Sequence, residues 1–187
     1  MTLYSAVVFV HVASALGVFA ALSLEAVALL HLRRATVGSE ARVWLEFAPG
    51  LTALTAASFL LLLLSGIFMT TQSSEWTLAW VRVALGALIL IGPLGAATGR
   101  KMRSIRNACA ANERNGSDLI SRLRDPFLKF SMNIRIATVL GIVLLMTSKP
   151  ELRQSLGIVV SAVFLGFVST VLWGRDTTSS VARAESR

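Results

Sequence analysis

The stretch that decides the fold is Leu3–Leu32, LYSAVVFVHVASALGVFAALSLEAVALLHL, which contains no Lys or Arg and one acidic residue, Glu25. Crossing the hydrocarbon of a bilayer takes about 20 apolar residues at ~1.5 Å each, so this run can span with some tilt. Four more runs have spanning length, and we predict transmembrane helices at 3–32, 49–70, 76–98, 127–147 and 156–173. The predicted fold is an all-α integral membrane helical bundle of five transmembrane helices, a four-helix core plus a short fifth helix.

The composition agrees with this class of protein. Of 187 residues, 55% are hydrophobic and 15% charged, and the mean hydropathy is +0.69, which is typical of a multi-pass membrane protein. We predict a single transmembrane domain over 1–174, with cytoplasmic segments at 33–48 and 99–126, followed by a disordered cytoplasmic tail at 175–187. The single cysteine, Cys109, excludes an internal disulfide and a thiolate cluster.

The distribution of basic residues predicts the orientation. The segments 33–48, 99–126 and 175–187 hold thirteen Lys and Arg, whereas the connections on the other side hold two, Lys149 and Arg153. Because Lys and Arg collect in cytoplasmic loops, we predict the N-terminus outside and the C-terminus in the cytoplasm. The net charge of +8 comes largely from these basic cytoplasmic segments. We expect them to contact the anionic headgroups of membrane lipid, and we expect no nucleic-acid partner.

Aromatic residues and local signals refine the boundaries. Tyr and Trp are expected at the two interfaces: Tyr4, Trp76 and Trp80 outside, Trp44 and Trp173 inside. Ser39 predicts a short surface helix at 40–47, after which Pro49 would occupy the first turn of the second span. Asp125-Pro126 predicts the same start for the fourth span, with Asp125 as N-cap. The spacing of apolar residues predicts that the third helix continues into the cytoplasm.

Glu25, Arg135 and Arg82 are the ionisable residues that we predict to be buried inside the apolar runs. They are candidates for function, because such groups are costly in lipid. Helical side chains lean toward the N-terminus of their helix, so Arg82 and Arg135 can each reach a membrane surface. Glu25 instead leans toward the membrane centre and borders a ridge of small residues. We therefore predict that Glu25 pairs with Arg135, either as a structural contact or as part of a proton or ion site.

His11 is the candidate cofactor ligand. It lies about 12 Å below the outer surface by helix rise, and His31 lies about 30 Å further along, so one monomer cannot use both as ligands of one haem or metal. Met69 and Met146 end the second and fourth spans on the outer side and could offer soft ligands to Cu(I) together with His11. We expect their depths to match that of His11 poorly, and we assign no metal site from the sequence.

The first span and the turn after it resemble a group of small bacterial membrane proteins. The residues that carry the resemblance are Phe9-Val10-His11-Val12-Ala13-Ser14-Ala15-Leu16-Gly17, Arg33-Arg34 and Leu64-Ser65-Gly66-Ile67. They resemble uncharacterised integral membrane proteins grouped loosely around the copper-resistance protein D and HemJ-type protoporphyrinogen oxidase families. The resemblance implies haem b or copper at His11 and a place in the bacterial inner membrane. This chain lacks the Trp that usually follows that histidine in those families, and it lacks a second histidine in mid-membrane.

Three hypotheses for the function follow. The first is a non-catalytic multi-pass inner-membrane protein, in which Glu25 and the arginines serve packing and topology, with a second copy or another membrane protein as partner. The second is a haem- or copper-associated redox protein that uses His11. The third is a small proton-coupled transporter component that uses Glu25. We find no catalytic motif in the sequence, which favours a non-enzymatic protein.

Overall fold

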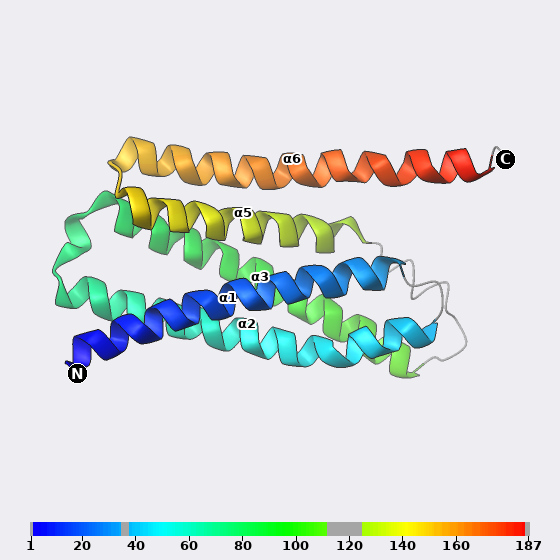
Figure 1. The fold of residues 1–187 in the computed structure, drawn as a ribbon, viewed down its shortest axis with the longest axis horizontal. Helices are drawn as coiled ribbons and strands as arrows, with labels where there is room; N and C mark the ends of the chain where they lie inside the picture. The colour runs from blue at the N-terminus through cyan, green and yellow to red at the C-terminus, as the bar shows by residue number, and fades with distance from the viewer. Residues whose placement is uncertain (1, 35–37, 112–124, 186–187) are drawn as a thin grey trace.

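Five long helices and one short 3-10 turn make up the part of the chain that the structure, a computed structural model, describes: residues 2–34, 38–111 and 125–185, without the side chains of 33–45, 108–111 and 172–185. The elements are α1 (Leu3–Arg34), α2 (Gly38–Gln72), η1 (Glu75–Thr77), α3 (Ala79–Ala111), α5 (Pro126–Ser148) and α6 (Leu152–Glu185) (Figure 1). All five long helices contain a segment that is long and apolar enough to cross a membrane. The protein is a multi-pass membrane protein with an all-α helical bundle, as predicted.

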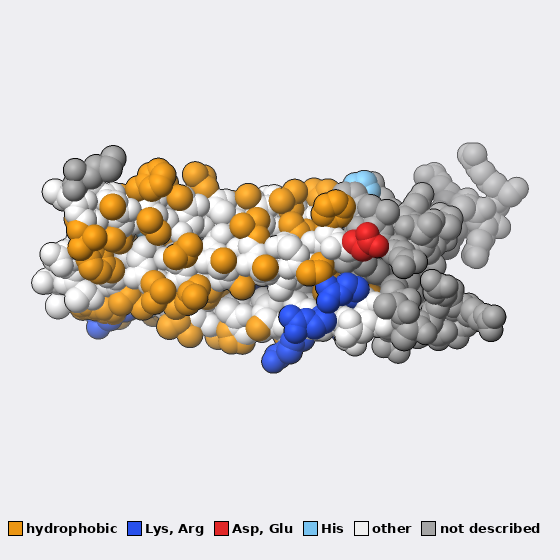
Figure 2. All heavy atoms as spheres, turned by 90° about the horizontal axis from the view of Figure 1, so that it is seen from below, with side chains coloured by type: hydrophobic (Ala, Val, Ile, Leu, Met, Phe, Trp, Pro, Cys, Tyr) orange, Lys and Arg blue, Asp and Glu red, His pale blue; other side chains and the backbone are white. Residues whose placement is uncertain are grey.

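The surface of the bundle is suited to lipid. Large apolar side chains such as Phe9, Leu90 and Val160 point outward and are 65–73% exposed. In the face that Figure 2 shows, hydrophobic side chains extend along most of the bundle, and the charged ones gather toward its ends. Tyr4 and Trp76 lie at the end where α1 begins, which we call the amino-terminal end. The side chains of Trp44 and Trp173 lie outside the described residues.

The helices pack as two groups. α1 packs along α2, while α5 packs along α6 and also contacts α3; the contacts of α2 with α3 and of α1 with α5 are less extensive (Figure 1). We call the boundary between the α1–α2 pair and the α3–α5–α6 group the seam. Within the second group the backbones of α5 and α6 approach closely, since a Cβ at Gly166 would lie 3.0 Å from the carbonyl oxygen of Asn133. Two cavities lie along the seam, and a third, of about 640 Å³, lies between α5 and α6.

The start of α5 confirms the predicted cap. The Asp125 side chain accepts a hydrogen bond of 2.8 Å from the backbone N–H of Phe127, and Pro126 occupies the first turn, where a missing N–H costs little. Lys101, in the predicted continuation of α3, forms an ion pair with Asp125. The Lys101 ammonium also donates a hydrogen bond to Asp125. This bond, together with the one from the Phe127 N–H, holds the pKa of Asp125 below its usual range. The contact joins the α3 continuation to the beginning of α5.

Two predicted boundaries need correction. The separate helix at 40–47 is wrong, because α2 begins at Gly38 and runs without a break to Gln72, with Pro49 inside it. Proline lacks the N–H that would bond the carbonyl four residues earlier. An additional hydrogen bond in the same turn stabilises the helix around Pro49, because the Thr52 hydroxyl donates to the Ala48 carbonyl over 2.9 Å. At the other end of the chain, α6 continues to Glu185, where we predicted a disordered tail. No Gly or Pro follows Gly174 to end the helix.

Candidate functional site

The seam encloses two cavities at different levels of the bundle. The larger, which we call the His11 cavity, has a volume of about 330 Å³ and lies toward the amino-terminal end. The smaller, the Glu25 cavity, has a volume of about 30 Å³ and lies toward the opposite end. Each is lined by residues of α1, α2, α3 and α5. Both groups of helices therefore contribute to both cavities, and a change in the packing of the seam would alter the two together.

Ser65 fixes the hydrogen on the His11 ring. The Ser65 hydroxyl oxygen lies 3.0 Å from His11 Nδ1, and it also lies 2.6 Å from the carbonyl of Leu61 and 3.1 Å from that of Leu62. A hydroxyl has a single hydrogen. Because the shortest of these contacts is the one to the Leu61 carbonyl, we infer that the Ser65 hydrogen is donated there and that the Ser65 oxygen accepts from His11 Nδ1–H. In the neutral ring Nε2 then carries a lone pair, which is the arrangement of a histidine prepared to bind a ligand through that atom.

Two thioethers share the cavity with His11. Met69 on α2 and Met146 on α5 both line it, so three side chains that we expected at different depths border one cavity. The reason lies in the direction of the side chains, which lean toward the start of their own helix. His11 leans toward the amino-terminal end, whereas Met69 and Met146, on helices that run the opposite way, lean toward the bundle interior. The structure thus brings three soft donor groups into one space.

Charged and aromatic side chains lie at the amino-terminal end of the same cavity. Tyr4, Glu75, Trp80 and Lys149 line it there. The Lys149 ammonium lies 5.9 Å from the centre of the Trp80 ring, within the range of a cation–π contact. Lys149 ends α5 in a left-handed conformation, with φ of 46°. The cavity therefore combines an apolar interior with a polar end.

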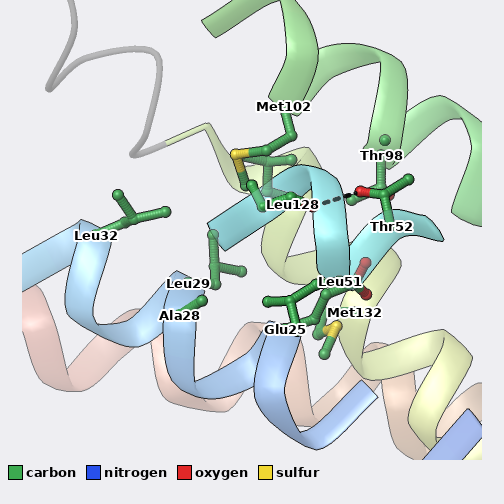
Figure 3. Close-up of a pocket in the computed structure, with 12 residues that line it drawn as sticks. Glu25, Ala28, Leu29, Leu32, Leu51, Thr52, Thr98, Met102, Leu128 and Met132 are labelled. Carbon is green, nitrogen blue, oxygen red and sulfur yellow. Dashed lines mark hydrogen bonds between the residues drawn. The ribbon is translucent and has the colours of Figure 1, made fainter. Parts of the chain in front are cut away.

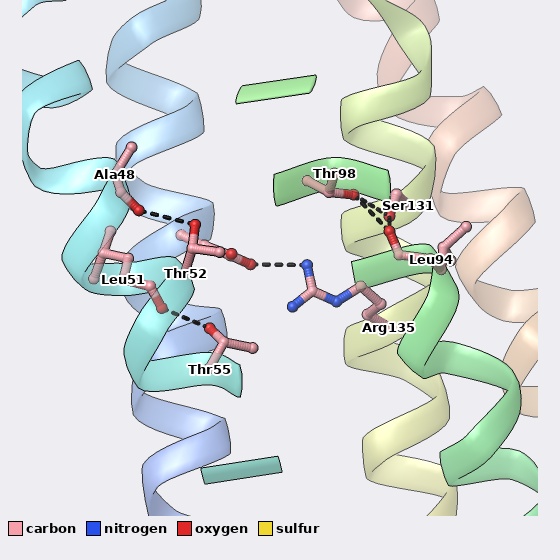
Figure 4. Close-up of polar contacts among 9 residues, drawn as sticks. Ala48, Leu51, Thr52, Thr55, Leu94, Thr98, Ser131 and Arg135 are labelled. Carbon is pink, nitrogen blue, oxygen red and sulfur yellow. Dashed lines mark hydrogen bonds and ion pairs between the residues drawn. The ribbon is translucent and has the colours of Figure 1, made fainter. Parts of the chain in front are cut away.

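The predicted contact between Glu25 and Arg135 is confirmed. Arg135 Nη1 donates to Glu25 Oε2 over 2.9 Å, and the two side chains are 5% and 18% exposed. Figure 4 shows Arg135 reaching from α5 across the seam, away from the Thr98–Ser131 hydrogen bond beside it. The absence of a side chain at Gly95 makes room for it, because a Cβ there would lie 3.4 Å from Arg135 Nε. The ion pair joins the two groups of helices.

The Glu25 cavity next to this pair was not predicted. Besides Glu25 it is lined by the hydroxyl-bearing residues Thr52 and Thr98 and by two methionines, Met102 and Met132 (Figure 3). The sequence contains five methionines, and every one after Met1 lines one of the two cavities. Methionine spacing gives no periodic signal in the sequence, because the four residues lie on three different helices. Only the packing of those helices brings the pairs together.

The other predicted ionisable residues lie elsewhere. Arg82, which we grouped with the buried ionisable residues, is exposed; its guanidinium donates to the Thr77 carbonyl over 3.2 Å, toward the amino-terminal end. The prediction that the Arg82 side chain leans toward the amino-terminal end is confirmed, whereas the prediction that it is buried is wrong. His31 is exposed near the end of α1. Within the described residues, no three or more His, Cys, Asp and Glu side chains gather as a metal cluster.

Comparisons with family models, with curated proteins and with solved structures find no match for this chain. Its function is therefore argued from the two cavities and the ion pair alone.

Proposed function

We propose that this chain is a non-catalytic multi-pass membrane protein that binds a soft monovalent metal ion, Cu(I) or its analogue Ag(I), in the His11 cavity. The observation that carries the proposal is the meeting of one oriented imidazole and two thioethers in a single cavity. In this proposal the donors are Nε2 of His11 and the sulfurs of Met69 and Met146, three residues that line the cavity. Thioether and imidazole ligands favour Cu(I) over hard ions such as Mg²⁺ and Ca²⁺, which prefer oxygen.

Each neighbouring group has a role in this proposal. Ser65 is a positioning residue, because it holds the hydrogen on Nδ1 and leaves Nε2 to bind. The apolar wall, which includes Leu62, Leu88 and Ile142, keeps competing water away from the ion. In this proposal the cavity lies on the outer side of the bacterial inner membrane, with membrane lipid around the exposed apolar side chains; the bias of Lys and Arg toward the other end supports this orientation.

Haem b, the second cofactor implied by the resemblance, fits the cavity less well. At about 330 Å³ the space lies near the lower limit of ligand pockets, which run from roughly 300 to 1,000 Å³. The His11 ring also packs directly on α2, since a Cβ at Gly66 would lie 3.3 Å from its Cε1. A rigid porphyrin needs free space around its axial ligand, whereas a bare ion needs only the donor atoms.

The test is metal binding by the full chain, purified in detergent without a histidine tag and with Cys109→Ser to remove the thiol. Ag(I) is added and unbound ion is removed, and the bound ion is measured by elemental analysis; the same is done with Cu(I) under ascorbate. We expect His11→Gln and the double variant Met69→Leu/Met146→Leu each to lose one bound ion. His31→Gln is the matched control and should keep it.

Two results would contradict the proposal. One is unchanged Ag(I) binding in the double methionine variant, whose side chains keep nearly the original volume and so preserve the fold. The other is a strong Soret band in the visible spectrum of the purified protein that is lost in His11→Gln, which would make haem the ligand. Spectra of the oxidised and reduced protein therefore accompany the metal analysis.

A further inference from the structure

We propose that the Glu25 cavity is a second station for the same soft cation, and that Arg135 is a tethered cation that the arriving ion displaces. The protein then carries the ion from one end of the seam to the other. This inference rests on the proposed function of the His11 cavity but concerns a different set of residues: Glu25, Met102 and Met132 as ion-binding groups and Arg135 as the displaced group.

The distribution of methionine is the first argument. Leucine, isoleucine and valine fill most of the core cluster, and any of them could fill a gap of methionine size. Yet the four methionines after Met1 divide into two pairs, Met69 with Met146 and Met102 with Met132, one pair in each seam cavity. Each pair is joined by one more group that can bind a cation, an imidazole in one cavity and a carboxylate in the other.

The ion pair is the second argument. A buried carboxylate must have a positive partner, and in this structure Arg135 supplies it at 2.9 Å. The soft cation carries the same single charge as the guanidinium. When it binds between Glu25, Met102 and Met132, it takes the place of Arg135 at the carboxylate, and the displaced guanidinium remains in the core as one added positive charge. The unpaired guanidinium makes this ion-bound state unstable, so departure of the ion, which restores the original pair, is favoured.

The state of the seam between the cavities is the third argument. Val18, Leu22, Leu88 and Val139 belong to the buried core cluster there, so an ion cannot pass unless the seam changes its packing. The two groups of helices meet less extensively across the seam than within each group, and the Glu25–Arg135 bond is a polar link across it. Loss of that bond is the step that allows the groups to move apart at the Glu25 end.

α3 has the features of the moving element. Its first half lines the His11 cavity through Trp80 and Leu88, and its second half lines the Glu25 cavity through Thr98 and Met102. Pro93 lies between them inside the helix, where it removes one backbone hydrogen bond and makes a bending point. On the facing helix, the Thr138 hydroxyl is buried and has no hydrogen-bond partner among the described residues. It lies three residues from Arg135 and provides a polar atom between the two stations.

The test compares two matched double variants, each in the Cys109→Ser background and with Ag(I) as the probe. Met102→Leu/Met132→Leu removes the thioethers of the Glu25 cavity, and Met69→Leu/Met146→Leu removes those of the His11 cavity. We expect two bound ions in the parent protein and one in each variant. In proteoliposomes, we expect Ag(I) uptake by the parent and its loss in both variants. Helical content by circular dichroism shows that each variant is folded.

Arg135→Gln tests the displacement separately. Without the competing guanidinium, the Glu25 station should bind Ag(I) roughly tenfold more tightly, and uptake should fall because release is slowed. Glu25→Gln should bind one ion rather than two. If Met102→Leu/Met132→Leu still binds two ions and keeps full uptake, or if Arg135→Gln leaves the affinity unchanged, the carrier proposal is wrong. If instead only Met69→Leu/Met146→Leu keeps both ions, the proposed function of the His11 cavity is wrong.

Discussion

Removing Glu25 should destabilise the protein far more than removing Arg82. In Glu25→Ala, Arg135 stays in the core with 5% of its side chain exposed and without its partner. Breaking a buried pair in this way costs about 3–5 kcal/mol. For a chain of this size each kcal/mol changes the melting temperature by about 2–4 °C, so we expect a decrease of roughly 6–20 °C. Arg82→Ala removes an exposed guanidinium and should cost about 1 kcal/mol or less.

Thermal unfolding in one detergent, followed by circular dichroism, measures both variants. The double variant Glu25→Leu/Arg135→Leu is the informative companion, because exchanging a buried ion pair for apolar side chains is often neutral or stabilising. It should recover most of the stability lost in Glu25→Ala. Equal melting temperatures for Glu25→Ala and Arg82→Ala would refute the reasoning, and so would a double variant that is less stable than Glu25→Ala.

Three further results are expected. Asp125→Ala should cost about 1 kcal/mol of unfolding free energy through loss of the α5 cap. Because folding lowers the pKa of Asp125, the stabilisation by this carboxylate is complete above pH ~3.9 and is lost as the pH falls further. The melting temperatures of the parent protein and the variant should therefore converge in acid. Gly166→Val should separate α5 from α6 and lower the melting temperature by several degrees. Gly157→Val should leave the melting temperature nearly unchanged, because no atom lies within 4 Å of a Cβ added there. Equal effects of the two variants would contradict the close packing of α5 on α6. Ser65→Ala should weaken Ag(I) binding roughly tenfold, as loss of a group that orients a metal ligand usually does. The variant should keep the helical content of the parent protein. Unchanged affinity would show that Ser65 does not orient His11 for binding.

The sequence was sufficient for the spans and for the ion pair. Hydrophobic length identified all five helices. Glu25 and Arg135 could be paired because both are costly in lipid, lie at similar depth, and one of them cannot reach a surface. The cap at Asp125 was also predictable, since a side-chain acceptor followed by proline is a local signal that does not depend on packing.

The cavities could not be predicted, because they depend on how helices face one another. Depth counted along the chain placed Met69 and Met146 at a different level from His11, while the lean of side chains on antiparallel helices reduces that difference. Met102 and Met132 look like ordinary apolar positions, and their place beside Glu25 follows only from the packing of α3 and α5 across the seam. Pro49 was misjudged for the opposite reason: a local rule favours proline at a helix start, but the tertiary structure tolerates it inside α2.

The Glu25–Arg135 pair also has a consequence for biogenesis. The two residues are 110 positions apart in the sequence, so at a synthesis rate of 5–20 residues per second the carboxylate on α1 precedes its partner by roughly 5–20 s. The polar side chains of α2 do not wait for a partner on another helix. The hydroxyls of Thr52, Thr55 and Thr70 donate to carbonyls four residues earlier in the same helix. The nascent α1 must therefore keep Glu25 protonated or near water until α5 arrives, which makes the joining of these two helices a late step in assembly.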